Sequence, residues 1–179
     1  MRAPPSFSLP SMTALHLKAP YWIRQGIFDD LRSFDAFEHR VNKLIEEKDR
    51  GDAFEIFVER YLATQPITQR VRHWVVGSIP LDLRERFKLP KDGTGIDGIY
   101  ETHDGSNVAY QVKYRQKQQL TFAEVAPFLG ITEQFSDRVI FTNATTLSDK
   151  AVIQTRWVSR EVFRALSPCR SGFALDRLW

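Results

Sequence analysis

A β-hairpin predicted in the middle of the chain constrains the fold most strongly. Two segments rich in β-branched and aromatic residues, Ile96–Thr102 and Asn107–Tyr114, flank the sequence His103-Asp104-Gly105-Ser106. An Asp-Gly pair between two such segments is typical of a tight hairpin turn. The chain must then contain a sheet, and the remaining elements must pack against it.

The hairpin would bring a distinctive set of polar side chains together. Asp97 and Gln111 would lie on neighbouring strands. Because side chains alternate along a strand, Gln111 and Lys113 share one face while Val112 points to the other. A carboxylate and an amide oxygen beside a lysine are the groups that metal-assisted phosphodiester hydrolysis requires.

Helical patterns on both sides of the hairpin predict an α/β fold. Ser33 is a candidate N-cap for a helix, and Asp52–Thr64 places its apolar residues on one face at helical spacing. The charged segment Glu46–Arg50 is expected to be a break between these two helices. The order of elements predicts a central mixed β-sheet flanked by helices. The other expected elements are a strand at Trp74–Val76, a helical turn within Pro80–Pro90, a helix at Thr121–Gln134, a strand at Arg138–Thr142 and helices at Ser148–Trp157 and Ser159–Leu166.

Composition indicates an ordinary globular protein. The 179 residues are 42% hydrophobic and 26% charged with a net charge of +3, which suits one domain with its own core. We expect an N-terminal arm at residues 1–32, the functional domain at 33–167 and a tail at 168–179. The single Cys169 excludes an intrachain disulfide and a cysteine-based zinc cluster. No apolar run is long enough to span a membrane, and we expect a cytoplasmic protein.

Two glutamates of the second helix, Glu55 and Glu59, are four residues apart and lie on one stripe of it. The structural interpretation is a pair of solvated glutamates on an amphipathic helix. The functional interpretation is that one of them is a further carboxylate facing the hairpin.

Three motifs together resemble the nuclease core of the PD-(D/E)XK superfamily. They are Gly51-x-x-Phe54-Glu55, Gly95-Ile96-Asp97 and Gln111-x-Lys113. The nearest branch is the Mrr-like restriction endonucleases, which include nuclease domains fused to helicases and typically carry Gln at the position of Gln111. Ile96 stands where the superfamily name has proline. The resemblance covers about Asp52–Ala144 and implies a restriction-endonuclease-like core.

The resemblance implies a role for each residue of these motifs. Asp97 would be the central ligand of Mg²⁺, with Mn²⁺ able to substitute, and Gln111 and the Val112 backbone carbonyl would complete the shell. Glu55 would hold a metal-linked water, and Lys113 would position or deprotonate the attacking water. The products of the superfamily carry a 5′-phosphate and a 3′-hydroxyl.

Basic residues give a weaker indication of DNA contact. Lys113, Arg115 and Lys117 alternate along the third strand and its extension. Arg156, Arg160 and Arg164 recur every four residues and predict a basic ridge, although a solvated helix face explains them equally well.

These observations predict a metal-dependent DNA endonuclease, the N-terminal module of a larger restriction or helicase-type protein of defence systems or mobile elements. Its partners would be DNA and a helicase or translocase. The alternatives are a non-catalytic nucleic-acid-binding module of the same fold and a protein-interaction domain in which Asp97 and Lys113 form a surface ion pair. Convergence of Glu55, Asp97, Gln111 and Lys113 on one point would favour the enzyme.

Overall fold

The protein has an α/β architecture built on a mixed central sheet, as predicted. The computed structural model describes residues 16–65, 70–117, 119–149 and 155–166. Its main sheet has five strands in the order β1-β2-β3-β5-β7. The first three are antiparallel neighbours, and β3, β5 and β7 run parallel. These strands are β1 (Arg70–Val75), β2 (Gly98–Thr102), β3 (Asn107–Lys113), β5 (Asp137–Thr142) and β7 (Arg156–Val158), and a separate pair is formed by β4 (Gln119–Leu120) and β6 (Thr146–Leu147).

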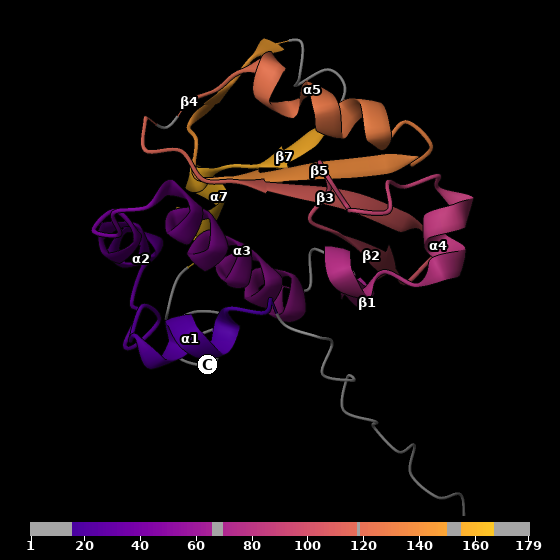
Figure 1. Cartoon of the computed structure of the whole chain (residues 1–179). Coiled ribbons are helices and arrows are strands. Elements are labelled where there is room, and N and C mark those ends of the chain that lie inside the picture. Colours follow the sequence, from indigo (N-terminus) through magenta and orange to yellow (C-terminus); the bar gives the residue numbers. More distant parts are fainter. Residues whose placement is uncertain (1–15, 66–69, 118, 150–154, 167–179) are drawn as a thin grey trace, which may run out of the picture.

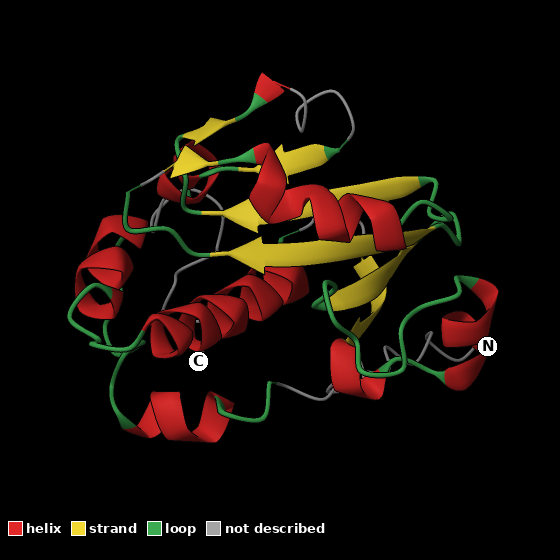
Figure 2. Ribbon diagram, turned by 45° about the horizontal axis from the view of Figure 1, so that its top comes forward, coloured by secondary structure: helices red, strands yellow, loops and turns green. Residues whose placement is uncertain are grey.

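Helices cover both faces of the sheet (Figures 1 and 2). α5 (Phe122–Ile131) lies across one face, where a Thr121–Glu124 capping box satisfies its first turn. α4 (Leu81–Arg86) packs into the core on the same side. The other face is covered by α1 (Ala19–Arg24), α2 (Phe34–Val41), α3 (Glu47–Thr64) and α7 (Arg160–Arg164).

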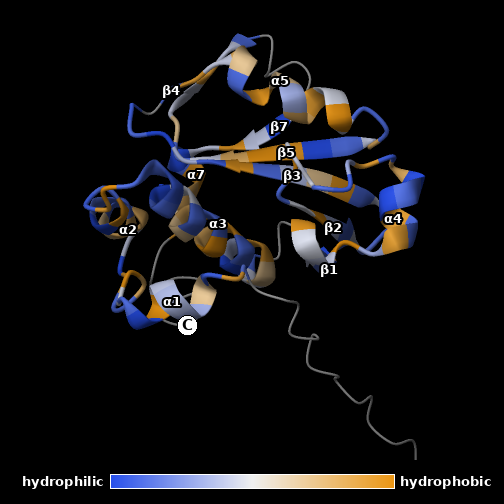
Figure 3. Ribbon diagram, in the orientation of Figure 1, coloured by the Kyte–Doolittle hydropathy of each residue, from blue (hydrophilic) through white to orange (hydrophobic). Residues whose placement is uncertain are grey.

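Alternation along β3 divides the core into two layers. Val108, Tyr110 and Val112 pack with the helices on the α3 side, whereas Ala109 packs with α4 and α5. β5 follows the same rule, and its hydrophobic middle lies between α3 and α5 (Figure 3). The sequence predicted that Val112 points to one face of the sheet while Gln111 and Lys113 point to the other, and the packing of β3 agrees with this.

The predicted hairpin is present, with β2 two residues shorter than expected. Gly98 pairs with Tyr110, and the chain turns through Gly105, whose φ of 81° suits glycine. Asp97 directly precedes β2, and its backbone forms hydrogen bonds with two different segments. Its N–H donates to the Tyr110 carbonyl at 3.1 Å, and its carbonyl accepts the Val76 N–H at 2.9 Å.

Two predicted boundaries are wrong. Residues 47–50 are not a break, because α3 already begins at Glu47, where acidic residues of the first turn interact favourably with the helix dipole. Arg50 also donates to the Leu44 and Ile45 carbonyls, at 2.6 and 2.8 Å. The predicted helix Ser148–Trp157 has the wrong C-terminal boundary. Trp157 lies in β7, where it pairs with Ile140 of β5. Ser159 occupies the N-cap position of α7, as expected from the sequence, but its side chain makes no capping hydrogen bond.

The described part of the predicted N-terminal arm belongs to the folded unit. Trp22, Phe28 and Leu31 are each at most 3% exposed and share a core with α2 and α3. The predicted boundary at residue 33 therefore does not separate an arm from the domain. The predicted tail, with Cys169, lies outside the described residues. None of the helices in the described ranges is long and apolar enough to cross a membrane.

Candidate functional site

Asp97 is the most firmly held residue of the predicted site. Besides its two backbone bonds, its Oδ2 accepts the Val112 N–H at 2.6 Å, a short charge-assisted bond. Burial raises the pKa of Asp97, while the Val112 N–H and the charge of Lys113 lower it. The neighbouring Gly98 has no room for a side chain, because a Cβ there would lie 2.4 Å from the Tyr110 hydroxyl. The Asp97 carboxylate is thus fixed at the junction of β1, β2 and β3.

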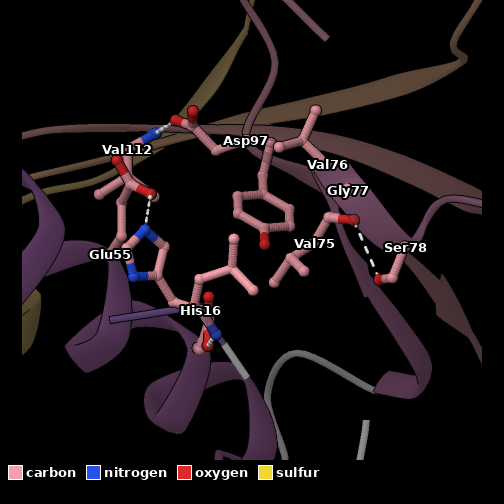
Figure 4. A pocket seen from close by; sticks show the side chains of 11 residues that line it. His16, Glu55, Val75, Val76, Gly77, Ser78, Asp97 and Val112 are labelled. Atoms are coloured by element: carbon pink, nitrogen blue, oxygen red, sulfur yellow. Dashed lines mark hydrogen bonds and ion pairs between the residues drawn. The ribbon is translucent and has the colours of Figure 1, made fainter. Parts of the chain in front are cut away.

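Glu55 of α3 faces Asp97 across a cavity of about 370 Å³. Figure 4 shows the Asp97 carboxylate against the Val112 N–H and the Glu55 carboxylate against the His16 ring. Burial raises the pKa of Glu55, and the negative charge of Asp97 raises it further. Two half-buried carboxylates that share one cavity disfavour the doubly charged state. The site therefore attracts either a proton or a cation.

The second candidate glutamate, Glu59, lines the same cavity but is used differently. Its Oε2 accepts the His16 backbone N–H at 2.9 Å, and burial raises its pKa to about 7. The negative charge of Asp97 raises the pKa of Glu55. Glu55 is therefore the helix carboxylate that interacts with the carboxylate of the hairpin. This arrangement favours the Glu55 interpretation over Glu59.

Gln111 and Lys113 lie on the other face of β3, as alternation requires. Gln111 is 4% exposed and donates from Nε2 to the Gly95 carbonyl at 3.0 Å. Its Oε1 is buried and has no hydrogen-bond partner among the described residues. Lys113 is close enough to lower the pKa of Asp97. The structure therefore brings Glu55 and Asp97 to one cavity, which neither Gln111 nor Lys113 lines.

The predicted basic ridge does not form. Arg156 lies on β7 and the other two arginines lie on α7, so the spacing of four is not a helical one. Each guanidinium also has an acidic partner: Arg156 pairs with Asp137 at 3.0 Å, Arg160 with Glu38 at 2.7 Å and Arg164 with Asp35 at 2.8 Å. These arginines tie α2, α7 and the sheet together.

Arg115 and Lys117 follow the end of β3, which stops at Lys113. They border a second, polar cavity of about 330 Å³ beside Thr121. Arg115 pairs with Glu124 of α5, and its backbone N–H donates to Asn143 Oδ1 at 2.6 Å. Lys117 is exposed and is the freer of the two for contact with a phosphate.

Sequence reasoning missed two participants. His16 lines the Asp97 cavity although it lies far from Glu55 in sequence, with no metal-ligand spacing that could have signalled it. Tyr110 lies beneath the cavity, and its hydroxyl is 2.7 Å from His73 Nε2 in a fully buried pair. Burial lowers the pKa of His73 to about 3, so this ring is neutral.

The donor set fits a hard divalent cation held by few protein ligands. Asp97 retains one carboxylate oxygen beyond the Val112 bond, and Glu55 supplies another from across the cavity. Among the described residues, no cluster of three or more His, Cys, Asp or Glu could hold a metal. Mg²⁺ commonly binds through one or two carboxylates and keeps waters or substrate phosphates for the remaining positions. Asp97 and Glu55 suffice for that mode.

Comparisons of the chain with protein-family models, with curated proteins and with solved structures found no match.

Proposed function

We propose that the protein is a Mg²⁺-dependent DNA endonuclease with a restriction-endonuclease-like core, as the motif resemblance implies. The observation that carries this proposal is the pair of half-buried carboxylates, Asp97 and Glu55, that line one cavity, with the charge of Lys113 acting on Asp97. Such a pair is unfavourable in its doubly charged form without a proton or a cation. The proposal accounts for why the fold maintains it.

A bound divalent cation would supply an acidified water and polarise the scissile phosphate. The residues of the chain perform the remaining tasks. Asp97 and Glu55 hold opposite sides of the site, and the Val112 N–H keeps the Asp97 carboxylate in one orientation. Lys113 offers a positive charge near Asp97, where negative charge develops as the phosphorus is attacked. Gln111 can contribute its unpartnered Oε1 only if its side chain turns from Gly95.

A cytoplasmic location and a fused or associated helicase or translocase belong to the same proposal and rest on the motif resemblance. The second candidate function is a non-catalytic nucleic-acid-binding module. It is favoured by one observation, which is that Gln111 faces away from the cavity and donates to Gly95. The third interpretation, a surface ion pair in a protein-interaction domain, is poorly supported, because Asp97 bonds the Val112 amide inside a cavity.

The test is a cleavage assay on the whole chain. Supercoiled plasmid and single-stranded DNA are each incubated with Mg²⁺, Mn²⁺ or EDTA. We expect cation-dependent cleavage that is lost in Asp97→Ala and kept in Asp82→Ala, which removes an exposed aspartate of α4. Cleavage in EDTA, or full activity of Asp97→Ala, would refute the metal assignment. DNA binding by the parent without cleavage would favour the second candidate.

A further inference from the structure

A short segment at the start of the described chain lies against the acidic stripe of α3. The His16 backbone N–H donates to Glu59 Oε2 at 2.9 Å. The His16 Nε2 lies 3.5 Å from Glu55 Oε2 and 3.8 Å from Asp52 Oδ1. Lys18 forms an ion pair with Asp52, which is 4% exposed. The segment is thus held to α3 by the backbone of His16 and by the side chain of Lys18.

The hydrogen bonds of His16 determine which ring nitrogen carries the proton. The Lys18 backbone N–H donates to Nδ1 at 3.2 Å, so Nδ1 is the acceptor of the ring. In the neutral ring the proton is then on Nε2. That nitrogen is the one directed at the Glu55 carboxylate, as Figure 4 shows.

We infer that His16 is a positioning residue, whose Nε2–H holds the Glu55 carboxylate turned toward Asp97. This inference rests on the proposed function and deepens it. Glu55 lies on a helix with several rotatable side-chain bonds, and the charge of Asp97 repels it. A donor on the opposite side of Glu55 offsets that repulsion and keeps both carboxylates in the cavity. Partners of this kind orient metal-binding carboxylates in proteins generally.

The position of His16 predicts a selective effect. His16 precedes α1 and its ring contacts Glu55 and Asp52 of α3. Among the described residues, no hydrogen bond or ion pair joins the ring to Asp97 or Lys113. Its loss should weaken cation binding and lower kcat, each by about tenfold or more. KM for DNA should stay near the parent value. His16→Gln retains an N–H donor of similar reach and should recover most of both losses.

The experiment compares four proteins: the parent, His16→Ala, His16→Gln and His39→Ala, which removes an exposed histidine of α2. Mn²⁺ affinity is measured by calorimetry, and cleavage by single-turnover kinetics. Long-range ¹H–¹⁵N spectra of the parent report the tautomer of His16 without reference to metal or activity. We expect a proton on Nε2, weak Mn²⁺ binding only in His16→Ala, and parental behaviour of His39→Ala.

Three results would overturn the inference while leaving the proposed function intact: a proton on Nδ1, parental Mn²⁺ affinity of His16→Ala, or His16→Gln as impaired as His16→Ala. A parent that neither binds Mn²⁺ nor cleaves DNA would instead refute the proposed function, and the role of His16 with it.

Discussion

Asp97→Asn should abolish cleavage and yet stabilise the protein in the absence of divalent cations. The substitution is nearly isosteric, and the new side chain still offers an oxygen to the Val112 N–H. It removes a half-buried negative charge that raises the pKa of Glu55. The effect on stability therefore runs opposite to the effect on activity.

The magnitude follows from the pKa of Asp97, which burial raises from 3.8 to about 6. The folded state binds this proton more tightly than the unfolded state, so ionisation of Asp97 reduces the free energy of unfolding as the pH rises. The loss begins near the unfolded pKa and is complete above the folded one. Two pKa units correspond to about 3 kcal/mol. Asparagine cannot ionise, so the variant avoids this loss.

Urea unfolding in EDTA at pH 5 and at pH 8 checks this prediction. The advantage of Asp97→Asn over the parent should grow between these two pH values toward about 3 kcal/mol. Mg²⁺ at pH 8 should stabilise the parent and leave the variant unchanged, since a ligand stabilises only the state that binds it. The exposed control Asp82→Asn should match the parent throughout. Destabilisation of Asp97→Asn at pH 8 in EDTA would refute the reasoning.

The other predictions concern the remaining residues of the site. Lys113→Ala should lower the cleavage rate by about a hundredfold or more while DNA affinity in a filter-binding assay stays near the parent value, because the lysine acts on the transition state. Glu55→Gln should impair plasmid nicking more than Glu59→Gln, since Glu55 is the partner of Asp97; the reverse order would assign the role to Glu59. Gln111→Glu should tighten Mn²⁺ binding in calorimetry only if this side chain reaches the cation, and equal cleavage by Gln111→Leu and the parent would exclude it as a ligand.

Local patterns in the sequence determined the hairpin and the faces of its strands. The Asp-Gly turn, the alternation that opposes Val112 to Gln111 and Lys113, and the Ser33 cap of α2 all depend on neighbours within a few residues. Such short-range rules hold in any tertiary setting. They were sufficient to place Asp97 beside β3 and to predict a mixed sheet between helices.

Only the tertiary structure decided which residues meet across elements. It turned Glu55 toward Asp97, brought His16 to Glu55, and gave each arginine of the predicted ridge an acidic partner. It also drew Trp157 into β7 rather than a helix, because β5 offered an open edge for parallel pairing. These contacts join segments far apart in the chain, and they follow from how the helices bury their apolar faces on the sheet. No pattern within one segment carries that information.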